Sequence, residues 1–524
     1  MKNTRFKDYS EVLLDKGWLL SPDLLEEEVE QDIIDDLLKK ADDAMLILNK
    51  DIYLLFLEQK NQIKANWADF EKASFSKEKK HDAKVYQSFL DFLKAQTTKE
   101  EEKSQIKILY SYEEDPKKRT YDDFVRMFNA RFRELHTILR QRQELQGLTS
   151  IARLLHKNER ETVSVIGMIK DKALTKNKNI LLTIEDLTGC IQAVISKDKK
   201  EAYDIAKDCV LDEVIGVVGA SGKKVVFVTN LLLPDVPLSK ELKKSPEEGY
   251  LVLLGDPHFG SKAFLKEPFE RFLEWINGKA GNEEQKDVAK KIKYLICVGD
   301  LVEGVGIHPN QEEDLEIKDV KEQYAEFANY LKQIPKHIPI ILISGNHDAG
   351  RIAEPQPRLY KDFAEPIWNL PNTTILSNPA WINLGATKDF SGFDILVYHG
   401  YSLIYYADNV ESIRLSGGQK RPDLIMKFLL QRRHLAPAHA STQYLPIAER
   451  DPLVISKVPD FFITGHIHRM SASNYRNVTL LNCSCWTEMS EDQEKRGLEP
   501  QPGRVPIINL KTREVKVMNF FGKE

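Results

Sequence analysis

The stretch "FFITGHIHR", residues 461–469, opens as an apolar run and closes on two histidines, His466 and His468. A short, nearly continuous apolar run is typical of a strand whose two faces are both covered. The whole chain of 524 residues contains only 12 histidines. Two of them at the end of one buried strand therefore indicate a role beyond packing in a core.

Four other apolar runs end in polar residues in the same way. They are "GYLVLLGDPH" (249–258), "KYLICVGD" (293–300), "IPIILISGNHD" (338–348) and "DILVYHG" (394–400). Helix-like segments alternate with these runs, so residues 247–524 are expected to form an α/β domain. Polar groups at the carboxyl ends of strands in such a domain meet in one crevice. The side chains expected there are those of Asp256, His258, Asp300, Asn346, His347, Asp348, His399, His466 and His468.

These residue types are typical of a transition-metal site. Imidazole together with carboxylate suits Mn, Fe or Zn better than Mg or Ca, which prefer oxygen ligands alone. Two such ions about 3.5–4 Å apart can clamp a phosphate and activate a water. Asp300 is the expected bridging ligand, because a carboxylate has two oxygens. Ordinary core histidines are the alternative, but five motifs in order behind five strands favour a binuclear metal centre.

The segment before this domain changes to the two-residue period of strands. Residues 158–240 contain five short strand candidates, with a helix-like stretch, "DKKEAYDIAKD", between the third and the fourth. This pattern predicts an OB-fold β-barrel. Such barrels bind single strands or other subunits. Phe227 is the clear aromatic residue in a strand, so a structural or subunit-contact role stays open beside nucleic-acid binding.

The N-terminal part of the chain has two different compositions. Residues 1–60 predict a small helical domain, since apolar residues recur at helical spacing after Ser21 and Pro22. That domain either docks a partner or only packs its own core. Residues 61–118 are polar and charged, which predicts a flexible linker.

Residues 119–157 predict a basic amphipathic helix region. Thr120 and Asp123 have the spacing of a capping box, and an apolar stripe follows them. Arginines make up much of the remaining surface of this helix. They are expected either to face phosphate or to lie on a solvated helix face.

The composition excludes several classes of protein. The net charge of −5 excludes a generally basic nucleic-acid coat. The five cysteines have no C-x-x-C spacing, which disfavours a disulfide framework and a structural zinc site. Cys483 and Cys485 are expected as small residues on one side of a strand. We find no apolar signal core and no membrane-spanning stretch, so the expectation is a soluble protein of the cytoplasm with no membrane partner.

The ordered motifs D-x-H, GD, GNHD, HG and GHxH resemble those of the calcineurin-like metallophosphoesterase superfamily. The resemblance implies one metal held by Asp256, His258, Asp300 and His468. It implies a second metal held by Asp300, Asn346, His399 and His466. His347 would assist the transition state or protonate the leaving oxygen, and Asp348 would orient His347. Pro257, between two of the ligands, departs from the expected pattern but leaves every ligand position filled.

Further stretches resemble the small subunits of archaeal D-family DNA polymerases. They include "GNHDAGRIAEPQPRL", "SIARLL" and "MKFLLQRRHLAP", and the resemblance covers roughly residues 105–520. It implies a 3′→5′ proofreading exonuclease that cuts DNA phosphodiester bonds and favours manganese. It also implies a large catalytic polymerase subunit and DNA with single-stranded or mismatched 3′ ends as partners. The alternatives are a catalytically silent scaffold subunit and a stand-alone metallophosphoesterase or repair nuclease.

Three further features each have two interpretations. Arg351 is placed to reach a substrate phosphate or to form a salt bridge or cap. Arg432, Arg433 and His434 either favour the dipole at a helix end or contact DNA. The tail "EVKVMNFFGKE" (514–524) reads as a last strand or as a sliding-clamp peptide, with Glu514 where a glutamine belongs.

Overall fold

The computed structural model describes residues 106–113, 117–157, 160–489 and 499–522, and ten residues between Thr4 and Leu48. The chain divides into two units, Met1–Glu100 and Glu101–Glu524. In the first unit, β1 (Thr4–Arg5) pairs antiparallel with β3 (Glu28–Val29), and β2 (Leu19–Leu20) pairs parallel with β4 (Ile47–Leu48).

The predicted helical domain is therefore wrong at β3 and β4, which lie inside the stretch with helical spacing. Val29 and Ile47 are β-branched and suit strands, so pairing with distant partners outweighs the local helical period there. The rest of the helical prediction for residues 1–60 lies outside the described residues. So does most of the predicted linker.

The linker prediction is wrong at its end, where β5 (Ile106–Ser111) pairs antiparallel with β15 (Ala380–Leu384). The strand forms because β15, more than 250 residues away in the sequence, supplies its hydrogen bonds. The charged local sequence around β5 gives no sign of this distant pairing. The predicted helix is confirmed as α5 (Tyr121–Leu139), with the Thr120–Asp123 capping box in place. Its arginines do not all face outward, however, because Arg131 is fully buried.

The predicted five-stranded barrel is confirmed. It closes in the order β10-β8-β7-β6-β9, with β8 and β10 parallel. The helices α6 (Ile151–Leu155) and α7 (Lys200–Asp208) contribute apolar residues to the barrel core. The strands are β6 (Thr162–Leu174), β7 (Ile180–Asp186), β8 (Gly189–Ile195), β9 (Val214–Gly222) and β10 (Val225–Leu232).

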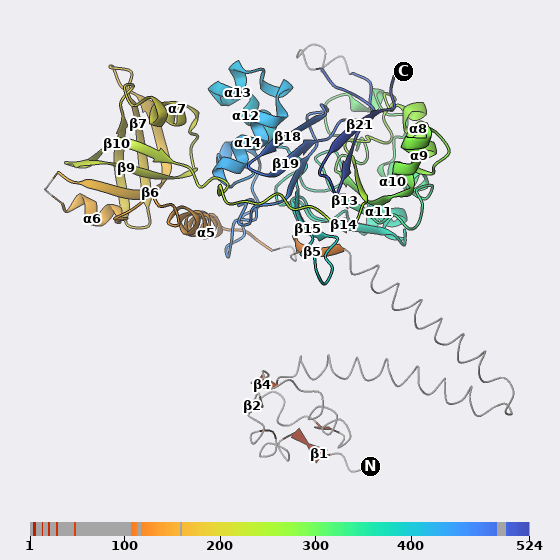
Figure 1. The fold of residues 1–524 in the computed structure, drawn as a ribbon, viewed down its shortest axis with the longest axis horizontal. Coiled ribbons are helices and arrows are strands. Elements are labelled where there is room, and N and C mark those ends of the chain that lie inside the picture. The colour runs from red at the N-terminus through yellow and green to blue at the C-terminus, as the bar shows by residue number, and fades with distance from the viewer. Residues whose placement is uncertain are drawn as a thin grey trace. The chain divides into compact units, whose positions relative to one another are not determined.

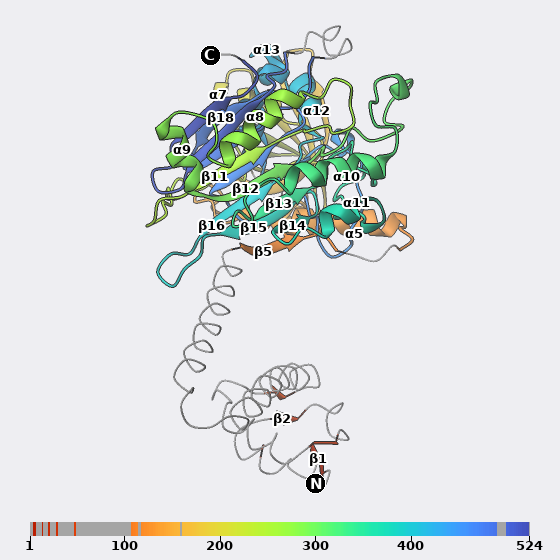
Figure 2. The same ribbon diagram turned by 90° about the vertical axis from the view of Figure 1, so that its right-hand side faces the viewer.

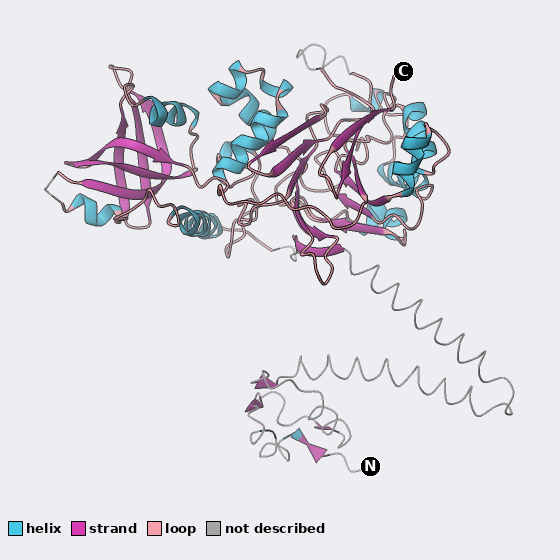
Figure 3. Ribbon diagram, viewed as in Figure 1, coloured by secondary structure: helices cyan, strands magenta, loops and turns pink. Residues whose placement is uncertain are grey.

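The remaining chain forms two six-stranded sheets (Figures 1 and 3). The first has the order β14-β13-β12-β11-β20-β21 and the second the order β18-β19-β17-β16-β15-β5. Their strands, besides β5 and β15, are β11 (Tyr250–Leu254), β12 (Ile292–Val298), β13 (Ile340–Ile343), β14 (Thr373–Leu376), β16 (Phe393–Val397), β17 (Phe461–Thr464), β18 (Ser471–Tyr475), β19 (Val478–Asn482), β20 (Arg504–Asn509) and β21 (Val515–Asn519).

Helices cover the outer face of each sheet, and the inner faces share one core. That inner core joins residues such as Leu253 and Ile296 of the first sheet to Val397 and Ile463 of the second. Figure 2 shows the helices of the first sheet facing the viewer. These are α8 (Lys266–Ile276), α9 (Glu283–Lys290), α10 (Val320–Leu331) and α11 (Lys361–Trp368). The second sheet carries α12 (Leu403–Asn409), α13 (Glu411–Leu415) and α14 (Pro422–Arg432).

Buried charged residues join the barrel and α5 to the two-sheet domain. Arg432 lies 2.7 Å from Glu213 of the barrel, and both are almost fully buried. His434 bonds to Asp451, which also pairs with Arg131 of α5 at 2.6 Å. The basic cluster at the end of α14 therefore joins parts of the protein, and its side chains do not form the DNA-contact surface that was one of the two predictions.

The C-terminal stretch confirms the strand interpretation. β21 pairs antiparallel with β20, and Phe520 is buried against aromatic rings such as Phe272 and Trp275. A clamp-binding peptide needs both of its phenylalanines accessible, and only Phe521 is exposed. Among the helices that the structure describes, none is long and apolar enough to cross a membrane.

Candidate metal centre

The five motif strands end at one place, although they belong to two sheets. Asp256 and His258 follow β11, Asp300 follows β12, and Asn346 and His347 follow β13, all in the first sheet. His399 follows β16, and His466 and His468 follow β17, in the second sheet. Because β11, β12 and β13 are parallel, as are β16 and β17, each sheet presents its carboxyl ends at one edge. The site is the meeting point of those two edges.

The structure brings the predicted ligands into contact. Two groups have ligand atoms within 4.8 Å of one another, Asp256 with His258 and His468, and Asp300 with His399 and His466. A third group joins His258 and His347 to Glu303. The Nε2 atoms of His258 and His468 lie 3.1 Å apart, and His399 Nε2 lies 3.0 Å from Asn346 Oδ1. Lone pairs from separate strands therefore point at shared centres.

Asp300 lies between the two groups. Its Oδ2 is 3.2 Å from His399 Nε2 and 3.8 Å from His258 Nε2. Its Oδ1 accepts a hydrogen bond from the backbone N–H of His347 at 2.8 Å. One carboxylate oxygen thus faces both histidine groups while the other oxygen is held by the backbone, which is the arrangement that a bridging ligand requires.

The backbone at the site is strained. Asp256, His258, Asp300, His466 and His468 all have a positive φ, between 47° and 67°. A left-handed conformation costs a non-glycine residue about 1–2 kcal/mol. Such strain persists where the surrounding fold enforces it and is concentrated at functional sites. The sharp turns aim these side chains back over the strand ends.

Two glycines make room for the carboxylates. A Cβ at Gly345 would lie 2.2 Å from Asp300 Oδ1, and one at Gly465 would lie 2.7 Å from Asp256 Oδ2. Any larger residue at either position would push a carboxylate away from its histidines. The glycines beside these two motifs are therefore a spatial requirement of the site.

Hydrogen bonds to the second ring nitrogen orient two of the histidines. His399 Nδ1 lies 2.8 Å from the carbonyl oxygen of Val298, so Nε2 faces the cluster. His347 Nδ1 lies 2.9 Å from the carbonyl oxygen of Glu303. Such contacts fix the tautomer of a ligand and raise its basicity.

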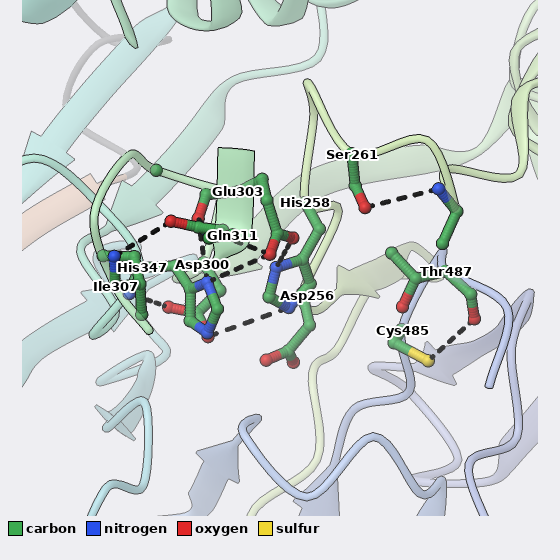
Figure 4. A network of polar contacts seen from close by, with 12 residues as sticks. Asp256, His258, Ser261, Asp300, Glu303, Ile307, Gln311, His347, Cys485 and Thr487 are labelled. Carbon is green, nitrogen blue, oxygen red and sulfur yellow. Dashed lines mark hydrogen bonds and ion pairs between the residues drawn. The ribbon is translucent and has the colours of Figure 1, made fainter. Parts of the chain in front are cut away.

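Glu303 is the site residue that sequence reasoning missed. Its Oε2 lies 3.0 Å from His258 Nδ1, and Gln311 contacts its other carboxylate oxygen at 3.3 Å (Figure 4). Burial opposes ionisation, but His258 outweighs it and lowers the pKa of Glu303 to about 2. Its place in "GDLVEG", three residues after Asp300, was the available signal.

The carboxylate of Asp348 bonds to backbone groups and to Tyr324, and its part in orienting His347 stays a prediction. This carboxylate accepts bonds from the backbone N–H groups of Gly345 and Leu301 and from the hydroxyl of Tyr324. Burial, together with Asp300, raises its pKa to about 7. The carbonyl oxygen of Glu303 orients His347, and Asp348 shapes the loop that carries Asn346 and His347.

Arg351 does not reach into the site. Its guanidinium donates to the carbonyl oxygens of Ala353 and Pro355 and lies over the ring of Tyr112. Among the described residues Arg351 forms no salt bridge, and its contact with a substrate phosphate stays a prediction. Cys483 and Cys485 are buried, but they follow the end of β19 at Asn482, so the prediction that they face one side of a strand is wrong. Cys485 also contacts His468, which lowers the pKa of its thiol against the effect of burial.

The charges of the site suit cations. His399 outweighs the effect of burial and keeps the pKa of Asp300 well below its usual range. In turn, Asp300 overcomes burial and raises the pKa of His399 to about 9. Burial, with His399 beside it, lowers the pKa of His466 to about 3. Metal binding here would release a proton from His399, and His466 would bind as the neutral ring.

Two apposed sheets, with a histidine–carboxylate cluster at their common edge, form the α/β domain that follows the five-stranded barrel. Residues 251–473 match the family model that describes the B subunits of DNA polymerases alpha and epsilon. The chain belongs to the family of archaeal DNA polymerase II small subunits, the D family.

Two relatives carry that assignment. The DNA polymerase II small subunit of Methanothermobacter thermautotrophicus is 36% identical over 74% of this chain and 77% of its own length. That of Pyrococcus furiosus is 38% identical over 76% of this chain and 64% of its own length. The chain thus spans slightly less than two thirds of the Pyrococcus protein. A solved asparaginyl-tRNA synthetase from Pyrococcus horikoshii matches 16% of this chain and 21% of its own, at 24% identity and a TM-score of 0.15.

Proposed function

We propose that this chain is a metal-dependent 3′→5′ exonuclease that removes mismatched nucleotides for a DNA polymerase. The observation that carries the proposal is the position of Asp300, whose single Oδ2 atom faces a histidine of each group. A scaffold has no need to keep such a carboxylate buried between histidines, since buried charges are costly unless they have a partner.

The residues present fit two divalent ions of the manganese, iron or zinc type. The first would be held by Asp256, His258, His468 and Asp300, and the second by Asp300, Asn346, His399 and His466. Every donor that the two sets require is present, and each comes from a rigid strand end. Such ions supply Lewis acidity toward the phosphate and a water activated for attack.

The protein's own side chains would position the substrate and transfer protons to and from it. The Nδ1 atom of His347 is held by the carbonyl oxygen of Glu303, which leaves Nε2 to exchange a proton with the substrate. The side chain of His347 is 19% exposed, so solvent and substrate can reach it, as they can reach the partly exposed His466 and His468. Burial lowers its pKa, which favours the neutral ring that accepts a proton. His347 is therefore proposed to take a proton from the attacking water at Nε2 and then to pass that proton to the leaving oxygen.

The proposed assembly follows from the relatives. They are named small subunits of DNA polymerase II, which supports a large polymerase subunit as the partner of this chain. DNA with an unpaired 3′ end is the proposed substrate, because a proofreading nuclease acts on ends that have left the duplex.

Digestion of a mismatched 3′-end primer by the purified chain tests this proposal. We expect shortening with Mn²⁺ and little shortening by Asp300→Ala or His347→Ala. Glu312→Gln is the matched control, because this glutamate is exposed and lies outside the cluster. Equal digestion by all variants would reveal a contaminant. No digestion with any metal, alone or with the large subunit, would favour a silent scaffold.

A further inference from the structure

The outer face of β8 and β10 on the barrel is a second feature with the chemistry of a binding site. One row of half-exposed apolar side chains crosses four paired strands. The pairing register places them side by side. The row consists of Leu181, Val194, Phe227 and Ala220.

Phe227 dominates this row. It is 47% exposed, although its neighbours Val226 and Val228 point into the barrel core. A Cβ at Gly222 would lie 3.0 Å from Phe227 Cε2, so the ring lies over the space that this glycine leaves. Gln192, paired opposite Val225, puts an exposed amide beside the ring.

Both ends of the face carry lysines on tight turns. At one end, Lys223 and Lys224 join β9 to β10. At the other end lies the turn between β6 and β7, which carries Lys176 and Lys178. Lys197, which follows β8, bonds to Asn179 of that turn, so β8 runs from one turn toward the other.

The backbone of these turns is unusual for lysine. Lys178 and Lys224 both have a φ of 62°. Glycine and asparagine adopt this conformation with less strain than lysine does. Among the described residues these are the two lysines with a positive φ, and both flank this face. Strain of this kind points to function.

The helices of the barrel leave this face uncovered. The apolar residues of α6 and α7 join the barrel interior, and α5 packs against β6 and β9 through Phe132, Leu135 and Leu139. Figure 1 shows α6 and α7 at opposite ends of the barrel.

We propose that this face binds single-stranded nucleic acid, independently of the metal centre. Lysines at both ends of the face fit successive phosphates of one strand. The Phe227 ring offers a stacking platform for an unpaired base, and Gln192 offers a hydrogen-bonding amide. An acidic protein segment would use the lysines but would leave the aromatic ring without a stacking partner, so charge and ring together favour the nucleic acid.

Binding of a fluorescent oligothymidylate of about 12 nucleotides, within the ~4–16 nucleotides that one such barrel covers, tests the proposal. The full chain is used with EDTA, so that cleavage and metal-dependent binding are absent. Phe227→Ala is expected to weaken binding about tenfold, since stacking on one base contributes about 1–3 kcal/mol. Tyr121→Ala, an exposed aromatic on α5, is expected to bind like the parent.

The lysines are tested through the salt dependence. The double variant Lys223→Ala and Lys224→Ala should lower the slope of log affinity against log salt by about 1.4, because each lost phosphate contact removes about 0.7 for a single strand. Lys279→Ala, in an exposed loop of the two-sheet domain, should leave the slope unchanged.

Four results would overturn the proposal. The first is no binding of the oligonucleotide by the parent at low salt, and the second is equal binding by the parent and Phe227→Ala. The third is equal binding of a duplex of the same length. The fourth is that Phe227→Ala loses binding of the large subunit rather than binding of the oligonucleotide. The last result would assign the face to a protein partner. Unchanged unfolding midpoints are expected for these variants, since the altered side chains are exposed. Failure here would leave the nuclease proposal standing, because the nuclease is tested by digestion.

Discussion

At the scale of single residues, the site depends on side chains whose orientation is fixed by contacts with neighbouring groups. Asp300 has one oxygen held by the His347 backbone and one that faces two histidines. Glu303 holds the far sides of both His258 and His347. A residue such as Glu303, which orients a proposed ligand, can be recognised only in three dimensions, because nothing in a sequence marks the partner of a ligand.

Loss of the Glu303 carboxylate should weaken metal binding without removing a proposed ligand. Glu303→Gln keeps the size of the side chain but loses the charge that faces His258. We expect the affinity for Mn²⁺ to fall about 10–100-fold, as for other partners of metal-binding histidines. Titration calorimetry measures this, and Glu312→Gln is the control. Unchanged affinity would show that Glu303 does not orient His258.

His434 should make the stability of the protein depend on pH. Its Nε2 contacts Asp451, and its Nδ1 accepts a hydrogen bond from the backbone N–H of Ala436, so the ring is neutral. Burial, with Arg131 nearby, lowers its pKa to about 4, below the unfolded value of about 6.5. Its contribution is therefore complete above about pH 6.5 and is lost as the pH falls toward 4.

The full shift corresponds to about 3 kcal/mol. Urea unfolding at about pH 7 and about pH 4.5 measures this loss. The variant His434→Gln should be less stable at the higher pH but should lose less stability on acidification than the parent. A decline as steep as that of the parent would exclude His434 as its source.

At the scale of elements, the sequence predicts strands and helices best where local pattern and tertiary setting agree. The apolar runs form β11, β12, β13, β16 and β17, and α5 begins directly after the predicted capping box. The division of those strands between two sheets was beyond local reasoning, because pairing order depends on distant contacts. β5 was missed for the same reason, since its partner lies far along the chain.

The pairing of α5 with the two-sheet domain should be energetically important. Arg131 and Asp451 are both fully buried, so removal of one partner leaves an uncompensated charge. We expect Asp451→Ala to lower the free energy of unfolding by about 3–5 kcal/mol. Glu144→Ala breaks the exposed pair with Arg142 and should cost about 0–1 kcal/mol. Similar losses for the two variants, in urea unfolding, would contradict the role given to the buried pair.

At the scale of the whole molecule, the charged contacts of α14 connect the barrel to the domain that bears the candidate metal centre. The sequence placed Arg432 and Arg433 at a helix end, where they favour the dipole, or against DNA, and Arg432 does lie in the last turn of α14. Both arginines are buried, and Arg433 donates to carbonyl oxygens of Ile455 and Ser456. A basic cluster in a sequence does not show whether its charges face solvent or another domain.

Removal of Glu213 should uncouple the barrel from the two-sheet domain. Its loss leaves Arg432 buried without its carboxylate partner, at a cost of about 3–5 kcal/mol at the contact. Calorimetry should then show two separated unfolding transitions for Glu213→Ala. Lys170→Ala, which removes an exposed ion pair within the barrel, should unfold like the parent. A single transition shifted as a whole would mean that Glu213 does not couple the two parts.

The proposed function depends on Asp300 as the bridge between two metal ions, each held by ligands from both sheets. Electron paramagnetic resonance of the Mn²⁺-loaded chain, with a metal count on the same sample, tests it most directly. Two ions per chain with an exchange-coupled spectrum are expected, since bridged ions lie about 3.5–4 Å apart. In Asp300→Ala the coupling should vanish. One ion per chain, or two ions whose spectra show no coupling in the parent, would contradict the bridged centre.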